Sequence, residues 1–265
     1  MTRASSRRAR VTWLDLAAVP LLVFLAVPFV ALVLALTPGR LIDDLGSAMV
    51  LRALGLTLAT TLVATLLILL GGTPVAYLLA RRRFPGRDWI DTLVDLPITV
   101  PPVVCGVALL LAFGRRGLIG QGFEALGIQV TFSTLAVILA QVFVASPFFI
   151  RTARAGFEAV PERLEASART LGAGPWHTFW TVSVPLARPA LLAGTVLAWA
   201  RALSEFGATM MFAGNFPGRT QTLALAVMSA MESDLHTALA ISALALLFGV
   251  ATLLLARRWA RAVVA

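Results

Sequence analysis

Six long apolar stretches dominate the pattern of hydrophobic and polar positions along the chain. Apolar residues are continuous within them, as in the runs ATLLILL and ALALLFG, and do not alternate with a period of two. Continuous runs of about 20 residues are typical of helices that cross the roughly 30 Å hydrocarbon layer, and they are unlike the strands of a membrane barrel. We expect helical spans at about residues 13–36, 54–80, 92–113, 130–150, 190–213 and 235–256.

Two apolar segments need separate treatment. The run from Thr222 to Met231 is too short to cross the hydrocarbon layer, so we expect a re-entrant or interfacial segment there. The first stretch follows basic residues, as a signal sequence does. It has about 24 residues and no cleavage site of small residues, and we therefore expect a retained first span.

The composition is also typical of an integral membrane protein. Of the 265 residues 59% are hydrophobic and 13% are charged, and the mean hydropathy is +0.89. Soluble domains have about 45–50% apolar and about 25% charged residues. The expected fold class is therefore an all-α integral membrane protein of about six transmembrane helices, with residues 1–265 forming a single transmembrane domain.

Arginine is the source of the net charge of +9, because all 22 basic residues are Arg. Such an excess is compatible with nucleic acid, with anionic lipid or with membrane topology. Sixteen arginines fall on one side of the predicted spans and five on the other, with Arg201 inside a span. The positive-inside rule places the side with sixteen, and both termini, in the cytoplasm. Topology explains the charge, so we expect the lipid bilayer as a partner and no nucleic acid; residues 1–12 form a cytoplasmic amino-terminal tail.

The longest polar connection, residues 151–189, lies on the predicted cytoplasmic side. Pro161 is followed by Glu162 and Glu165, and a proline in the first turn with acidic residues after it suits a helix N-terminus. We predict a short helix from about 161 to 171.

Glycine and proline residues mark the end of that helix. Gly172 and Gly174 stop it and Pro175 prevents its immediate continuation. We predict a second short helix from Trp176 to about Val182, before Pro185, where the chain returns to the membrane.

Small side chains at Ala166, Ser167 and Ala168 let another surface approach the backbone of the first helix. Glu165 and Arg169 are four residues apart and can pair on one flank. Spacing alone supports two interpretations equally: a solvated helix packed on its own neighbours, and a docking site.

This connection resembles the cytoplasmic "EAA" loop of binding-protein-dependent ABC importer permeases. The loop pattern is Glu-Ala-Ala, three residues, Gly, nine residues, Ile-x-Leu-Pro, and the spacing from Gly172 to Pro185 matches it. Counting back from Gly172 puts Ala166, not Glu165, at the position of the family's glutamate. The resemblance implies that the loop is a coupling helix that docks on a cytoplasmic ATPase.

Two further segments resemble the oxyanion permeases. The stretch DLPITVPPVVCGVALL resembles their Leu-Pro-x-x-x-Pro-Pro segment. Pro97, Pro101 and Pro102 are expected to break the helix at membrane depth, where a protein or water-filled path must surround it. The stretch ARALSEFGATMMFAGNFPGRTQTLALAV resembles molybdate and tungstate permease subunits, with Ser204 where Gly is usual. The resemblance covers roughly residues 50–265.

The resemblance implies the architecture of a type I ABC importer permease in the cell inner membrane. It implies a membrane subunit that translocates molybdate or tungstate, works as a homodimer with two copies of an ATPase, and receives its cargo from a periplasmic binding protein. ATP and magnesium would be bound by the partner ATPase, and this chain would hold no cofactor. Two alternatives stay open: a sulfate or thiosulfate importer, and an ATP-independent secondary anion carrier.

Ionisable residues inside the predicted spans are candidates for a gate or pathway, because charges in a span are costly. Arg201 and Glu205 are four residues apart and can form an ion pair, either structural or functional. The two histidines, His177 and His236, are placed on opposite sides of the membrane, so they cannot share a metal ion within one chain. The chain has no lysine, and a phosphate loop that binds ATP requires one. We expect no metal site and no catalytic residue in this chain.

Overall fold

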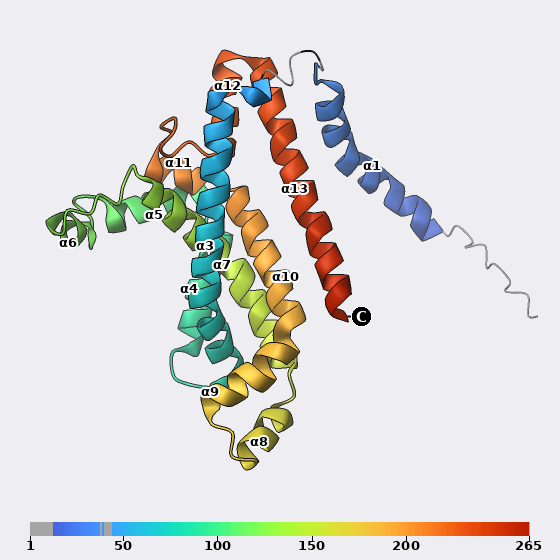
Figure 1. Ribbon diagram of the computed structural model, residues 1–265, viewed down its shortest axis with the longest axis vertical. Helices are drawn as coiled ribbons and strands as arrows, with labels where there is room; N and C mark the ends of the chain where they lie inside the picture. Colours follow the sequence, from blue (N-terminus) through green and yellow to red (C-terminus); the bar gives the residue numbers. More distant parts are fainter. Residues whose placement is uncertain (1–12, 38, 40–43, 265) are drawn as a thin grey trace, which may run out of the picture.

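The computed structural model describes residues 13–37, 39 and 44–264, and the regular secondary structure of those residues is helical (Figure 1). Five helical segments are long and apolar enough to cross a membrane, and a bent pair of helices brings the number to six if the pair counts as one span. Four of these segments lie in α1 (Trp13–Leu34), α3 (Ala48–Arg81), α7 (Thr134–Ala159) and α13 (Leu235–Val264), and the fifth runs from Pro175 to Leu203. The expectation of about six spans in an all-α protein is confirmed.

Three helices form the central bundle: α3, α7 and α10 (Val184–Leu203). Phe149 and Phe157 of α7 are fully buried at its centre. A Cβ atom on Gly194 of α10 would lie 3.2 Å from the Phe149 ring, and one on Gly156 would collide with Ala190. Small residues at these positions therefore let α7 and α10 pack closely, as is usual for helices in a membrane.

The third predicted span is broken at Pro101 and Pro102, as expected, but not at Pro97, which lies inside a helix. Helix α4 (Arg87–Thr99) and helix α5 (Pro102–Phe113) meet at an angle of 119°. Val100 has an extended backbone, which is the conformation that a following proline favours, and neither Pro101 nor Pro102 can donate a backbone hydrogen bond.

The fifth predicted span has different bounds from those expected. One uninterrupted helical segment runs from Pro175 to Leu203, made of α9 (Pro175–Thr178), a π-helical turn (Phe179–Ser183) and α10. The predicted end of a second short helix before Pro185 is therefore wrong. In the π-helical turn the Val184 N–H bonds to the Phe179 carbonyl five residues back. This wider turn lets the helix continue through Pro185, which has no backbone N–H to donate.

The other end of this segment was also predicted wrongly, because the helix does not continue to residue 213. It ends at Leu203, and a separate short helix, α11 (Gly207–Ala213), packs against α5. A Cβ atom on Gly106 of α5 would lie 2.7 Å from the Ala208 carbonyl oxygen, so the two backbones touch at this point.

The short apolar segment after residue 222 forms α12 (Leu223–Ser233), which packs against α13 and α3. The Leu223 N–H donates a buried hydrogen bond of 2.8 Å to the Thr57 hydroxyl of α3. Asp234 then precedes α13, where the Thr237 hydroxyl and the His236 N–H hydrogen-bond to its carboxylate and lower its pKa. A carboxylate at this place suits the positive end of the helix dipole.

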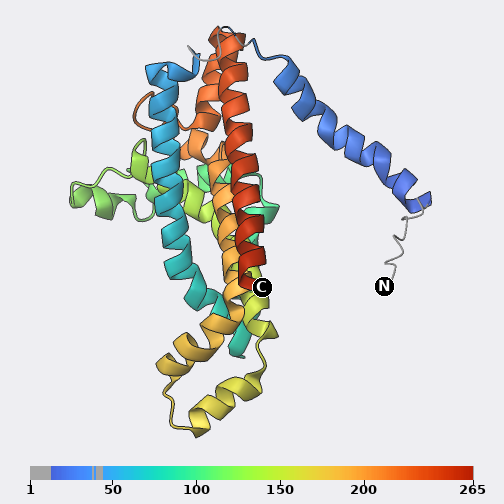
Figure 2. The ribbon, with the colours of Figure 1, turned by 45° about the vertical axis from the view of Figure 1, so that its right-hand side comes forward.

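Different helices form the two ends of the molecule (Figure 2). Helix α8 (Glu162–Thr170) and α9 lie together at one end, and α12 lies at the other. Helices α5 and α6 (Gly120–Ala125) project sideways from the bundle, while α1 stands apart from it. The polar α8–α9 end is the predicted cytoplasmic end.

Candidate functional site

Helix α8 is the centre of the predicted coupling loop, and it begins and ends close to the predicted bounds. Glu162 and Glu165 lie in its first turn and Arg169 in its last, which suits the helix dipole. Glu165 is the one fully buried residue of the nine, with 5% of its surface exposed. The loop therefore turns its acidic residue inward.

Glu165 lies in a buried polar cluster with partners from two other parts of the chain. Its Oε1 accepts hydrogen bonds from Arg81 Nε at 3.0 Å, from Arg81 Nη2 at 2.8 Å and from the Ser183 hydroxyl at 2.9 Å. Tyr77 OH lies 3.4 Å from Oε2. The predicted pairing of Glu165 with Arg169 is wrong, because the carboxylate points toward the membrane domain while Arg169 is exposed.

Arg81 is the last residue of α3, and its side chain is almost as buried as that of Glu165. Its Nη2 also donates to the Val160 carbonyl at 2.9 Å, at the end of α7. The Tyr77 ring packs edge to face on Phe157 and Phe179, with centroid distances of 5.3 and 4.9 Å. The cluster therefore joins α8 to the ends of α3 and α7 and to the π-helical turn.

The outward face of α8 carries several small and short side chains, next to the exposed Arg163 and Leu164. Ala166 and Ser167 are exposed, and Ala168 is half-buried. The hydroxyls of Ser167 and Thr170 donate to carbonyls one turn back, on Arg163 and Ala166, at 2.9 and 3.0 Å. Around Ala166 and Ser167 these short side chains leave the helix backbone accessible.

Gly172 closes α8. Its φ is +89°, its N–H bonds to the Arg169 carbonyl, and the Ala173 N–H bonds to the Ala168 carbonyl. This pair of bonds is a Schellman motif, in which the left-handed residue is normally glycine. Leu171, immediately before it, is 89% exposed. Pro185, the last residue of the motif in the sequence, lies in the first turn of α10, directly after the π-helical turn.

A cavity of about 320 Å³ lies beside the cluster, between α3, α8 and α9. Its lining comprises Tyr77, Arg81, Arg82, Glu162, Glu165, Arg169, Pro175 and Thr178. Charges of both signs meet in it.

Arg201 and Glu205, the candidate pair in the fifth predicted span, form the ion pair that the sequence allowed. Arg201 Nη2 lies 2.9 Å from Glu205 Oε2, and the Glu205 side chain is fully buried. Glu205 Oε1 accepts the Ala208 N–H at 2.7 Å, in the first turn of α11. Glu205 thus links the end of α10 to the start of α11.

Pro101 and Pro102 lie at the bend before α5, which carries Gly106 against α11. Gly207, the residue immediately before Ala208, also approaches the first turn of α5, since a Cβ atom there would lie 3.1 Å from Pro102. The four candidate pathway residues therefore belong to two neighbouring helix breaks.

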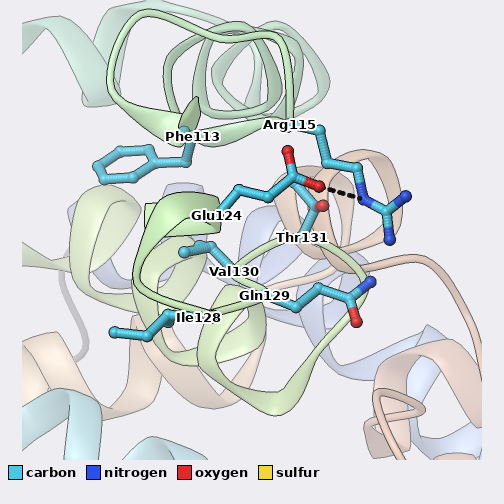
Figure 3. A pocket seen from close by; sticks show the side chains of 9 residues that line it. Phe113, Arg115, Glu124, Ile128, Gln129, Val130 and Thr131 are labelled. Atoms are coloured by element: carbon cyan, nitrogen blue, oxygen red, sulfur yellow. Dashed lines mark ion pairs between the residues drawn. The ribbon is translucent and has the colours of Figure 1, made fainter. Parts of the chain in front are cut away.

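A second hollow of about 190 Å³ lies at the projecting α5–α6 segment (Figure 3). The Glu124 carboxylate points toward the Arg115 guanidinium at 3.7 Å, and both side chains are exposed. Residues Gly127 to Thr131 complete the wall.

Other reactive side chains do not gather at these sites. Cys105 is a buried free cysteine in α5. His177 of α9 and His236 of α13 lie near opposite ends of the molecule (Figure 1). Among the described residues, no group of three or more His, Cys, Asp or Glu side chains could hold a metal ion.

Three residues of the buried cluster were missed from the sequence: Tyr77, Arg81 and Ser183. In the sequence Arg81 is only one of the sixteen arginines on the predicted cytoplasmic side. Its position at the end of an apolar span is the one local feature that could have indicated a buried role. Its separation of 84 residues from Glu165 leaves no periodicity to read.

Most of the chain is similar in sequence to named transport permeases. Over 232 residues, 88% of each chain, it is 41% identical to the Molybdenum transport system permease protein ModB of Mycobacterium bovis. It is 37% identical over 209 residues to the Sulfate transport system permease protein CysW of Synechococcus elongatus, which covers 79% of this chain and 73% of the relative.

The fold is shared with solved ABC importers. The crystal structure of a bacterial ABC transporter involved in the import of the acidic polysaccharide alginate has a TM-score of 0.75 at 16% identity, covering 94% of this chain and 93% of that one.

The family model that matches covers residues 72–264, which include the buried cluster, α8 and both helix breaks. A permease of this family is a non-catalytic, multi-pass component of the inner membrane; an ATPase subunit binds the ATP, and a binding protein delivers the cargo. The chain belongs to the family of binding-protein-dependent transport system inner membrane components.

Proposed function

We propose that this chain is the membrane subunit through which molybdate or tungstate enters the cell. The observation that carries the proposal is the 41% identity to a molybdenum permease over 88% of both chains. In the proposed assembly two copies of this chain bind two copies of an ATPase and receive the anion from a periplasmic oxyanion-binding protein. ATP and magnesium belong to the ATPase.

The loop over residues 151–189 is the proposed coupling site. Its support is the outward face of α8, where Ala166 and Ser167 are exposed and the serine hydroxyl is occupied by its own backbone. A partner surface can approach such a face closely, and the exposed Leu171 offers an apolar contact at its end. When ATP draws the two ATPases together, α8 moves with them and the spans change from inward-open to outward-open.

The proposed second copy is supported by surfaces that a single chain leaves uncovered. The span in α1 has no buried residue in its most apolar window, and α5 and α6 project sideways with Arg115 and Glu124 exposed. Charged side chains beside the spans are costly in contact with lipid. A second copy would cover them or enclose a water-filled path between the two chains.

The break residues Arg201, Glu205, Pro101 and Pro102 are the proposed gate or pathway elements. They are supported by their place at two helix breaks that pack on each other. An arginine next to a path suits an anion, because a guanidinium can donate to several oxyanion oxygens.

The test of the assembly is purification of the tagged chain in mild detergent from its own host, followed by mass spectrometry. We expect a P-loop ATPase in equal amount. A chain that purifies only with itself contradicts the proposal and favours a secondary carrier.

The cargo is tested by uptake into proteoliposomes that contain the purified complex, ATP inside and the binding protein outside. We expect labelled molybdate to accumulate and unlabelled tungstate to compete, with little competition from sulfate. Competition by sulfate but not by tungstate would favour a sulfate importer, which the 37% identity to CysW makes the second candidate.

The coupling loop is tested by Gly172→Pro. Proline cannot adopt the φ of +89° and would remove the bond to the Arg169 carbonyl. We expect uptake to be lost while the membrane fold is kept. Gly174→Ala is the control, since that position has a φ of −66° and open space around it. Normal uptake by Gly172→Pro would count heavily against the loop as a coupler.

A further inference from the structure

Helix α8 is held to the rest of the molecule by a charge. A surface helix usually buries a stripe of apolar side chains. In α8 the fully buried residue is Glu165, whereas Leu164 is 41% exposed. The main backbone contacts of α8 are with the π-helical turn and α9 that follow it. Its link to α3 is therefore the contact of Glu165 with Arg81 and Tyr77.

This link is directional. Both Arg81 Nε and Arg81 Nη2 donate to Glu165 Oε1, and the Ser183 hydroxyl donates to the same oxygen from the π-helical turn. Charge-assisted bonds from a guanidinium fix orientation as well as position, while apolar contacts do not. A rotation of α8 must therefore turn the end of α3 and the π-helical turn with it, or break the bonds.

We propose that Glu165 is a positioning residue that transmits the movement of α8 to α3 and to the long helix Pro175–Leu203, and that it does not contact the ATPase. The inference rests on the proposed function of the loop as the docking site of the ATPase. It separates two tasks: the exposed residues around Ala166 bind the partner, and the inward face with Glu165 passes the motion on.

The chemistry of the cluster supports this separation. Glu165 Oε1 accepts three hydrogen bonds within the protein and Oε2 faces Tyr77, so the carboxylate has its partners before any ATPase arrives. An ATPase side chain would have to displace Arg81, whose Nη2 also holds the Val160 carbonyl. Removing one member of a buried ion pair leaves the other charge uncompensated.

The test uses the complete complex in proteoliposomes, with Glu165→Gln and Arg81→Gln made singly and together. Three quantities are measured: the amount of ATPase that co-purifies, the rate of ATP hydrolysis, and the anions transported per ATP hydrolysed. We expect the ATPase to stay bound in all three variants. Transport per ATP should fall roughly tenfold or more in each single variant, and the double variant should be no worse than either single variant.

Glu162→Gln is the matched control, because it removes an exposed carboxylate from the first turn of the same helix. Its number of anions transported per ATP should equal that of the wild type, because an exposed residue on the docking side can change the amount of bound ATPase but not the inward contact with α3. Transport per ATP distinguishes coupling from a purely structural role, since a loss of folded protein lowers transport and hydrolysis together and leaves their ratio unchanged.

Three results would overturn the inference: loss of the ATPase from Glu165→Gln but not from Arg81→Gln, an unchanged ratio in both single variants, or additive losses in the double variant. If the wild-type chain binds no ATPase at all, the proposed function itself fails. That outcome is distinguishable, since it appears before any substitution is made.

Discussion

The contact between Gly106 of α5 and Ala208 of α11 gives a sharp test of how the two broken spans fit together. In Gly106→Ala the added Cβ would lie 2.7 Å from the Ala208 carbonyl oxygen and 2.8 Å from its Cα. Both are backbone atoms, which cannot rotate away as the end of a flexible side chain can. Helix α5 or α11 must therefore shift.

The size of the effect follows from two opposing contributions. Overpacking of a close contact costs about 1–3 kcal/mol, and the upper half of this range suits a backbone contact. Replacing glycine by alanine inside a helix returns about 1 kcal/mol. Gly71→Ala in α3 gains the second contribution alone, because a Cβ there meets nothing within 4 Å. The two variants should differ by about 2–3 kcal/mol, or about 4–12 °C in melting temperature.

The assay can use the single cysteine of the chain. Cys105 is 3% exposed and directly precedes Gly106, so a thiol-reactive fluorophore reports the opening of this region during heating. Gly106→Ala should label at a clearly lower temperature than Gly71→Ala. Equal labelling temperatures within about 1 °C would refute the close approach of α5 and α11, since no clash would then oppose the gain in helix propensity.

Two further predictions concern buried hydrogen bonds. Thr57→Val removes the acceptor of the buried Leu223 N–H and should cost about 1–3 kcal/mol, measured as a lower melting temperature, whereas Thr73→Val, whose hydroxyl only returns to its own helix, should cost less. Glu205→Ala leaves Arg201 unpaired and the Ala208 N–H without its acceptor, and it should cost about 3–5 kcal/mol of stability. Glu205→Gln keeps an acceptor for the Ala208 N–H and should have a melting temperature closer to that of the wild type. Equal losses in the two variants would show that the hydrogen bond from Ala208 to residue 205 contributes nothing to stability.

The sequence predicted the features that depend on local patterns. Apolar stretches of sufficient length indicated the spans, and Pro101 with Pro102 indicated the break between α4 and α5. Gly172 indicated the end of α8, because a left-handed turn needs glycine. Each of these depends on residues close together in the chain.

The features that were predicted wrongly depend on compensation or on distance. Pro185 was expected to end a helix, but the π-helical turn before it accommodates the missing donor. The span that was expected to reach residue 213 ends at Leu203, where Glu205 caps α11. Glu165 was paired with its neighbour four residues on, while its actual partner lies 84 residues away. Composition and periodicity carry no signal for such a pair.

With α8 moving as proposed, the continuous helix from Pro175 to Leu203 would act as a lever. Its 29 residues extend over about 43 Å, and its tightest crossing with α7 lies between Ala190 and Gly194. From this fulcrum the arm toward α8 is about 26 Å long and the arm toward Leu203 about 17 Å. A sideways displacement of about 4 Å at the α8 end would thus become an opposite displacement of about 2–3 Å beside Arg201. The helix break after Leu203 would move by this distance while the helix itself kept its shape.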